Sequence, residues 1–194
     1  IFWKEGSRLF LNQTVIPPFI KGQAAIFFGG NVNIGRRMHW RVYETEQFVN
    51  LDKIFQSADL RMINLLSVAA SAGAPNEEKN STQYFRARPE QLNILSDAGI
   101  NAVLNANHDA GDYGSDALLE QNDLLERAGI LHAGAGKNWE EASRPFCVRI
   151  DDINIAVFSV SAVFPVFAAA DDRPGTFYLP PDDLETWKKI FEVK

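Results

Sequence analysis

Cysteine is nearly absent from this sequence, since Cys147 is the only one among 194 residues. A single cysteine excludes an internal disulfide and any metal site built from several cysteines. Cys147 falls within a strand-like run, Pro-Phe-Cys-Val-Arg-Ile. We therefore predict that it is a small, buried hydrophobic residue.

Long apolar runs, internal repeats and low-complexity segments are also missing. No stretch is long and apolar enough to be a transmembrane segment. The 19 basic and 25 acidic residues give a net charge of −6, which argues against nonspecific nucleic-acid binding and for a soluble protein. No signal peptide is visible, and the first residue is Ile1. We expect a processed or truncated chain, either cytoplasmic or exported after signal removal.

The composition predicts a folded globular protein, because 46% of the residues are hydrophobic and 23% are charged. The length suits one domain, or one domain with an extension. Residues 1–23 hold apolar side chains without a clear period, and Pro17-Pro18 breaks any helix. We interpret them as an N-terminal arm that packs on the domain or on a partner, and residues 24–194 as the domain.

Apolar runs alternate with helical patterns along the domain, and this order predicts an α/β fold. The predicted strands are Ala24–Gly29, Leu60–Leu66, Asn101–Asn105 and Ile130–Ala133, followed by a hairpin of Phe146–Ile150 and Ile153–Val160. The predicted helices are Glu46–Ser57, one opened by Pro89, Ser115–Ala128, Trp139–Ala142 and Asp182–Phe191, and residues 69–81 are predicted to be a polar loop. We expect a largely parallel inner sheet with an antiparallel addition.

The stretch Asn101–Gly114 joins an apolar strand to a strong helix through a polar turn. Open α/β sheets bind their ligands at the carboxyl ends of strands. Asn107, His108 and Asp109 offer an amide, an imidazole and a carboxylate, which can ligate a hard metal, move a proton and orient the group that moves it. These residue types are also common in turns for their local hydrogen bonding, so a purely structural role is an alternative. Asp112 is a candidate cap of the following helix.

A second polar segment follows the first strand, where glycines allow a sharp turn and close approach to a ligand. Arg36 and Arg37 come next. Arginines can bind a phosphate or carboxylate in a bidentate manner, so these two are candidates for binding an anionic substrate. The alternative is that they belong to a solvated helix face.

The chain resembles the poly-gamma-glutamate capsule synthesis protein (CapA) family, which is related to the calcineurin-like metallophosphoesterases. The resemblance covers roughly residues 24 to 182. It rests on Phe-Phe-Gly-Gly-Asn-Val-Asn-Ile-Gly-Arg-Arg from Phe27, Ala58-Asp59-Leu60 with Ile63-Asn64-Leu65, the segment Phe85–Glu90, Ala-Asn-His-Asp-Ala-Gly-Asp-Tyr-Gly from Ala106, Ala128-Gly129-Ile130 with Gly134-Ala135-Gly136, and Arg173-Pro174-Gly175-Thr176.

The resemblance implies a metallophosphoesterase-like layered sandwich, with a mixed sheet flanked by helices and a two-metal site at the strand ends. It implies Asn31, Asn107 and His108 as ligands of a divalent metal (Mn, Fe, Zn or Mg), and His108 with Asp109 as catalytic residues. The chain ends before the region where the family places its later metal-binding histidines, so the domain is expected to be incomplete.

The sequence departs from the family pattern at the metal-binding positions. Asn31 occupies the position of an Asp ligand, and Leu66 that of a Glu ligand. The third motif reads Asn107-His108-Asp109 where the family has Asn-Asn-His. An Asp that bridges two divalent ions supplies charge that Asn cannot supply, and Leu supplies no ligand.

Two functions are compatible with these residues. The first is a metal-dependent hydrolase that acts on an anionic small molecule or polymer, with His108 as the general acid or base. The second is a catalytically degenerate family member, or a subunit of a split assembly, whose role is structural or interactive and whose domain a partner chain completes. The replaced Asp and Glu favour the second function, whereas the Asn-His-Asp cluster favours the first.

Overall fold

The computed structural model describes residues 22–35, 52–79 and 81–191. The predicted N-terminal arm lies outside the described residues, apart from its last two positions. Arg36 and Arg37 also lie outside them, as does the first part of the predicted helix Glu46–Ser57.

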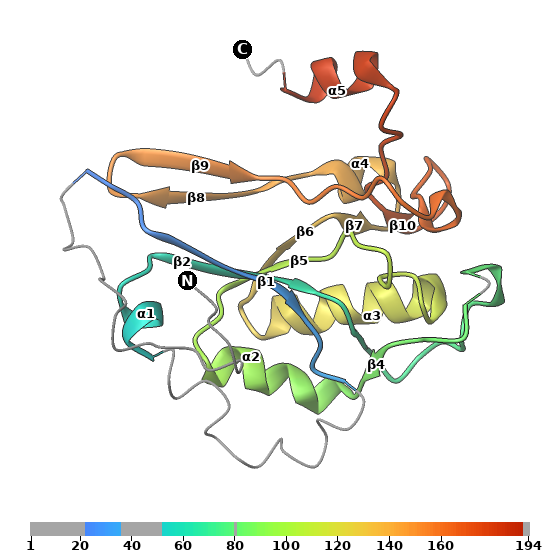
Figure 1. Cartoon of the computed structure of the whole chain (residues 1–194), viewed down its shortest axis with the longest axis horizontal. Helices are drawn as coiled ribbons and strands as arrows, with labels where there is room; N and C mark the ends of the chain where they lie inside the picture. The colour runs from blue at the N-terminus through green and yellow to red at the C-terminus, as the bar shows by residue number, and fades with distance from the viewer. Residues whose placement is uncertain (1–21, 36–51, 80, 192–194) are drawn as a thin grey trace, which may run out of the picture.

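Four parallel strands form the central sheet, in the order β1-β2-β5-β6 (Figure 1). Their bounds are Ile26–Val32 for β1, Leu60–Leu65 for β2, Ala102–Leu104 for β5 and Leu131–Ala133 for β6. Because every pair is parallel, the carboxyl ends of β1, β2 and β5 meet at one end of the sheet. The predicted α/β class and the predicted adjacency of the first three strands are confirmed.

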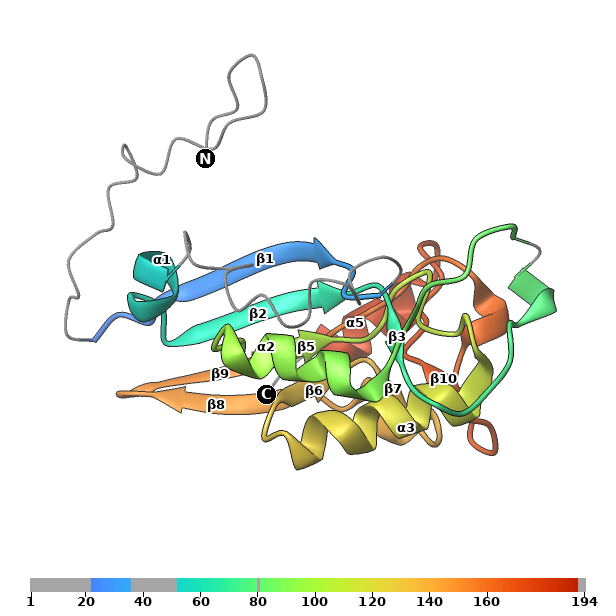
Figure 2. The ribbon, with the colours of Figure 1, turned by 90° about the horizontal axis from the view of Figure 1, so that it is seen from below.

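Helices cover one face of this sheet (Figure 1). They are α1 (Asp52–Gln56), α2 (Asn93–Asp97) and α3 (Gly114–Arg127), and Figure 2 shows α2 and α3 in front of the strands. The apolar residues that predict these elements meet in one core, which includes Ile63, Leu65, Leu95, Val103, Leu125 and Ile130. Parallel sheets need both faces covered, and this layer covers the first.

A two-stranded antiparallel hairpin covers the other face. Its strands are β8 (Phe146–Ile150) and β9 (Ile153–Val157), so the second strand ends before the predicted Val160. Phe146 packs with Leu60 in a second apolar core. Side chains alternate along a strand, so Cys147 points away from this core and is exposed. The prediction that Cys147 is buried is therefore wrong.

Short elements complete the fold, and several of them are absent from the sequence prediction. A 3₁₀ turn covers Glu77–Lys79 within the predicted loop of residues 69–81, and β3 (Val68–Ala69), at the start of that loop, pairs with β4 (Arg86–Ala87) beyond its end. The others are 3₁₀ turns at Pro89–Leu92 and Pro165–Phe167, β7 (Ala135–Gly136) paired with β10 (Gly175–Thr176), α4 (Trp139–Ser143) and α5 (Leu184–Phe191). In the described part of the chain, no helix has the length and apolar character needed to cross a membrane.

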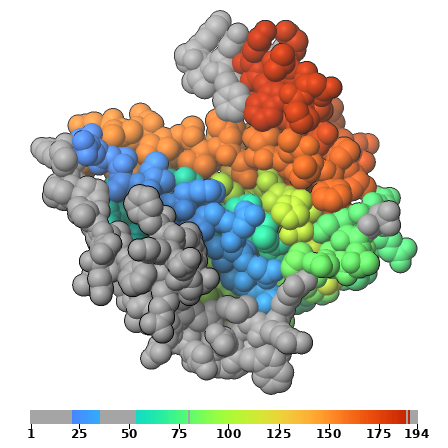
Figure 3. Space-filling view, viewed as in Figure 1, coloured from blue at the N-terminus to red at the C-terminus, as the bar shows by residue number. Residues whose placement is uncertain are grey.

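The edge strand β1 leaves large apolar side chains in solvent. Phe27 packs its ring against Phe55, with centroids 4.9 Å apart, on the helical side. Ile26 and Phe28 point to the opposite face because side chains alternate, and they are 46% and 55% exposed. Figure 3 shows β1, in blue, on the open surface beside the hairpin. This apolar strip lies on an edge where a further strand or chain can add.

Replacing Leu95 with alanine should lower the free energy of unfolding by about 2–5 kcal/mol, because the residue is fully buried and its truncation leaves a cavity. The matched control is Leu184→Ala on α5, where the side chain is 64% exposed and the change should stay within about 0.5 kcal/mol. Urea unfolding followed by circular dichroism measures both variants. Equal transition midpoints for the two would contradict this assignment of the core.

Candidate functional site

Three asparagine side chains meet at the carboxyl ends of the central strands. Asn31 lies on β1 and Asn64 on β2, where the two residues are register partners, and Asn107 follows β5. The side-chain nitrogen of Asn64 donates a 2.7 Å hydrogen bond to Oδ1 of Asn31. That of Asn107 donates to Oδ1 of Asn64 at 3.1 Å and to the carbonyl of Leu65 at 2.8 Å. The structure thus brings the predicted residues Asn31 and Asn107 together through Asn64.

Asn64 was not predicted to be a site residue, although its segment contributes to the family resemblance. It sits inside the apolar run of a central strand, where a polar side chain is unusual. A polar residue near the carboxyl end of a central parallel strand is the signal that identifies it, because ligand sites of α/β sheets lie there.

The turn after β5 combines a structural and a chemical feature. Oδ1 of Asn107 accepts a 3.0 Å hydrogen bond from the backbone N–H of Asp109, the local contact expected of a turn residue. The His108 side chain is 46% exposed and its Nε2 lies 3.2 Å from Oδ2 of Asp109, which is 2% exposed. An accessible imidazole beside a buried carboxylate is a suitable arrangement for proton transfer.

A buried lysine holds this turn in place. Nζ of Lys79 lies 2.7 Å from Oδ1 of Asp109 and 2.5 Å from Oδ1 of Asp112, and the three side chains are at most 4% exposed. Lys79 lies in the segment that is predicted to be a polar loop, residues 69–81. No local pattern in the sequence identifies its two partners, which lie 30 and 33 residues away.

Asp112 does not cap the helix that follows it, so that prediction is wrong. The N-cap position of α3 is Tyr113, which makes no side-chain capping bond. Oδ2 of Asp112 instead accepts a 2.7 Å hydrogen bond from the backbone N–H of Phe85. Asp112 therefore connects Lys79 to the segment that leads into β4. The local capping pattern in the sequence gives no indication of this contact.

The pKa values in this cluster reflect burial and pairing. Burial alone lowers the pKa of the Lys79 ammonium, but the hydrogen bonds to Asp109 and Asp112 and the charges of both carboxylates outweigh it, so the pKa lies above its ordinary value. Burial raises the pKa of Asp112, against the opposing hydrogen bonds from Lys79 and from the Phe85 backbone. Lys79 therefore stays charged at neutral pH.

The donor set at the strand ends fits a divalent metal poorly. The side-chain oxygens of Asn31, Asn64 and Asn107 each already accept a hydrogen bond, and all three are neutral. Oδ1 of Asp109 and Oδ1 of Asp112 are directed towards Lys79, and Oδ2 of Asp109 lies beside His108 with no hydrogen-bond partner among the described residues. Within residues 22–35, 52–79 and 81–191, no group of three or more His, Cys, Asp or Glu side chains is placed to hold a metal ion. Hard cations favour charged oxygen ligands.

Comparison with known proteins relates this chain to a family. A family model described as bacterial capsule synthesis protein PGA_cap matches residues 25–189. The proteins y4sH and y4uA of Sinorhizobium fredii are each 25% identical in an alignment of 162 residues that covers 74% of this chain and 35% of each relative. The capsule biosynthesis protein CapA of Bacillus anthracis is 23% identical over 112 residues, 57% of this chain and 27% of that protein. The chain thus spans about a third of the length of the curated relatives it matches.

Replacing Lys79 with methionine should lower the free energy of unfolding by about 3–5 kcal/mol, because two buried carboxylates lose their counter-ion. The matched control is Lys188→Met on α5, which removes an exposed pair with Glu185 and should cost less than about 1 kcal/mol. Chemical unfolding monitored by fluorescence measures both.

The difference in unfolding free energy between wild type and Lys79→Met should depend on pH in a defined direction. A lysine whose folded pKa is raised contributes stability that is fully present below its unfolded pKa, about 10.4, and is lost as the pH rises through the folded pKa. The difference between wild type and Lys79→Met should therefore stay constant from about pH 7 to 9 and shrink only at more alkaline pH. A difference that already shrinks near pH 7 would contradict a charged, doubly paired Lys79.

Proposed function

The chain belongs to the bacterial capsule synthesis protein family PGA_cap, and we propose that it is a catalytically degenerate member of that family. In this proposal its role is to bind an anionic ligand or a partner chain, and it does not hydrolyse a substrate with a bound metal. The supporting observation is the chain of neutral amides formed by Asn31, Asn64 and Asn107 at the strand ends.

The chemistry of the amide group explains why this observation matters. A carboxylate only accepts hydrogen bonds, so carboxylates that converge at strand ends need a cation between them. An amide both donates and accepts, so Asn31, Asn64 and Asn107 satisfy one another and hold the strand ends together without a metal. The resemblance places acidic ligands at positions 31 and 66, and this chain has Asn and Leu there.

The arrangement of layers supports the finer fold assignment within the same proposal. One layer of helices, the parallel sheet and the hairpin of β8 and β9 lie in succession (Figure 1). We assign this arrangement to the metallophosphoesterase type of sandwich, of which the described residues form a part.

Edge strand β1 supports an interaction role. Ile26 and Phe28 are the exposed large apolar side chains of that strand, and apolar strips of this kind are typical of surfaces that another protein segment covers. In the proposal, a partner chain or a further part of a longer protein pairs with β1 and buries them.

A hydrolase is the second candidate, and the pair of His108 and Asp109 supports it. The imidazole is accessible, and its carboxylate neighbour is fixed by Lys79. In this candidate Asp109 orients the imidazole, and His108 takes a proton from the attacking water or gives one to the leaving group of an anionic substrate. Arg36 and Arg37 lie outside the described residues, so their role in substrate binding stays a prediction. The metal dependence of the hydrolase stays a prediction as well.

Restoring the missing acids should create metal affinity that the wild type lacks. The double variant Asn31→Asp with Leu66→Glu should bind Mn²⁺ at least about tenfold more tightly than wild type, a change of about 1.4 kcal/mol, because it adds two charged oxygen ligands. The control Asn154→Asp with Leu184→Glu adds the same two charges at exposed positions and should bind as wild type does. Isothermal titration calorimetry measures all three. Tight stoichiometric Mn²⁺ binding by wild type would contradict the degenerate site.

Replacing His108 with alanine separates the two candidate functions. A degenerate member should hydrolyse a generic phosphodiester with added Mn²⁺ no faster than its His108→Ala variant does. A hydrolase should lose a factor of about 10²–10⁴ in rate, the usual contribution of a positioned acid or base. His108→Gln, which keeps a polar side chain in the turn, controls for folding. Metal-dependent turnover in wild type that both variants lose would establish the hydrolase and reject the degenerate member.

A further inference from the structure

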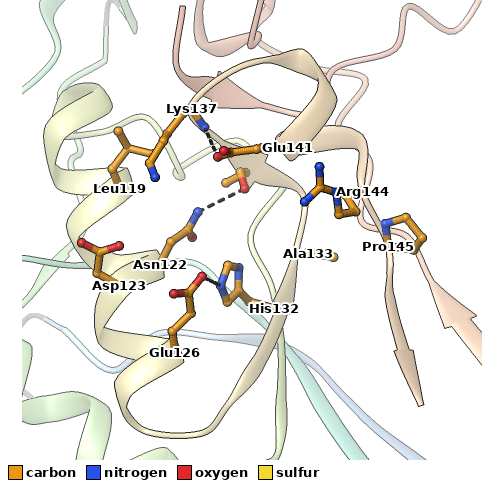
Figure 4. A pocket seen from close by; sticks show the side chains of 11 residues that line it. Leu119, Asn122, Asp123, Glu126, His132, Ala133, Lys137, Glu141, Arg144 and Pro145 are labelled. Carbon is orange, nitrogen blue, oxygen red and sulfur yellow. Dashed lines mark hydrogen bonds and ion pairs between the residues drawn. The ribbon is translucent and has the colours of Figure 1, made fainter. Parts of the chain in front are cut away.

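A polar pocket of about 320 Å³ lies away from the strand-end asparagines, between α3, the segment from β6 to β7, and α4 (Figure 4). None of Asn31, Asn64, Asn107 and His108 lines it. Its lining comprises Leu119, Asn122, Asp123, Glu126, His132, Ala133, Ala135, Lys137, Glu141, Arg144 and Pro145. We propose that this pocket binds a small zwitterionic molecule, which carries both an ammonium and a carboxylate group.

The acidic side of the pocket is formed by α3. Asp123 and Glu126 are three residues apart on this helix and therefore share a face. Glu126 lies 3.4 Å from Nε2 of His132 through its Oε1. Asp123 lines the pocket and forms no ion pair or side-chain hydrogen bond with the described residues. Its carboxylate is available to an ammonium group.

The basic side of the pocket comes from the segment around α4. The Lys137 ammonium has no ion-pair partner in the described part of the chain, and Arg144 pairs only with Glu140, 3.0 Å away, where both side chains are more than 60% exposed. An exposed pair of this kind contributes little, so a ligand carboxylate can replace Glu140 as the partner of Arg144. In Figure 4, the Lys137 side chain runs beside Leu119 on the α3 side of the pocket, and Arg144 lies across the pocket from Asp123.

The third acid of the pocket, Glu141, is engaged in local structure. Its Oε2 accepts a 3.0 Å hydrogen bond from the backbone N–H of Lys137, and its own N–H donates to Oδ1 of Asn138 at 2.9 Å. The second bond is the N-cap of α4, and the first ties the Glu141 carboxylate to the backbone just before that helix. Asp123 and Lys137 therefore have no charged partner among the described residues, whereas Glu126 and Arg144 each have one, His132 and Glu140.

Hydrogen bonds within the protein hold the polar residues at the floor of the pocket in place. Asn122 is buried, accepts a 2.9 Å hydrogen bond from Asn105 and donates one of 3.1 Å to the carbonyl of Ala135. Nδ1 of His132 is also buried and has no hydrogen-bond partner among the described residues. A rigid polar floor beneath separated charges fits a small polar ligand, and the volume is at the lower end of the range for ligand sites.

Charge complementarity selects the zwitterion over a singly charged ligand. A simple anion would pair with Lys137 and Arg144 and leave Asp123 and Glu126 facing a like charge, and a simple cation would meet the reverse problem. A molecule with both charges matches both sides at once. This inference goes beyond the proposed function and does not depend on it, because it involves neither the asparagine chain nor His108.

Binding of charge-matched probes tests the inference on the 194-residue chain in the presence of EDTA. The probes are 5-aminopentanoate and 3-aminopropanoate as zwitterions, with pentanoate and pentylamine as analogues that each retain one charge. Titrations followed by ¹H–¹⁵N NMR should give a dissociation constant of about 1 mM or lower for at least one zwitterion, and at least about tenfold weaker binding for both analogues. Shifted amide signals should fall on α3 and α4.

Paired substitutions localise the binding. Lys137→Gln and Asp123→Asn should each weaken binding of the zwitterion at least about tenfold. Arg149→Gln and Asp152→Asn remove the same two charges from the exposed hairpin end and should leave binding unchanged. The proposal would be overturned by absence of zwitterion binding, by binding of pentanoate or pentylamine as tight as that of the zwitterion, or by wild-type affinity in either pocket variant. Hydrolytic activity enters none of these measurements.

Discussion

The buried ammonium of Lys79 is the contact on which the polar end of this fold depends. Removing a charged group from water costs several kcal/mol, so neither Lys79 nor the carboxylates of Asp109 and Asp112 could be buried without the others. The cluster joins three segments, because Asp112 also binds the backbone of Phe85, and Asp109 lies beside His108. The position of the turn after β5 is therefore set by a lysine from a distant loop.

The same end of the sheet shows how polar side chains at strand ends can approach one another without charge. Parallel strands bring their carboxyl ends together, so any side chains at those positions must be compatible with close approach. Asn31, Asn64 and Asn107 achieve this by donating and accepting hydrogen bonds among themselves. Carboxylates at these positions would repel one another without a cation. Asn31 therefore takes part in these contacts without a charge, at a position where the resembled family has an acidic residue.

Periodicity predicted the strands of the sheet well, because β1, β2 and β5 are apolar runs. It did not predict that β1 leaves Ile26 and Phe28 exposed, because burial of an apolar run depends on what packs against it. It also predicted the segments around Asn31 and Asn107, because polar residues after a strand have a recognisable place in the α/β fold. It did not predict Lys79, whose partners are distant in sequence, or the exposure of Cys147, which depends on which face of the hairpin meets the sheet. Asp112 resembles a helix cap locally, but a stronger tertiary partner determines its position. Non-local pairing is the common reason for these differences.

Neutral amides also connect the interior of the molecule. Gln121 on α3 accepts a 2.6 Å hydrogen bond from the backbone of Ala69 and donates to Asn105, which in turn donates to Asn122. This network joins β3, α3 and the end of β5 without placing a charge in the core, so it needs no counter-ion. Most of these buried polar contacts are thus made by neutral amides, and charged side chains are used at two other places. The Lys79 cluster uses charge to hold the turn after β5. The pocket beside α3 carries charged side chains of both signs, and a ligand with both charges can pair with both.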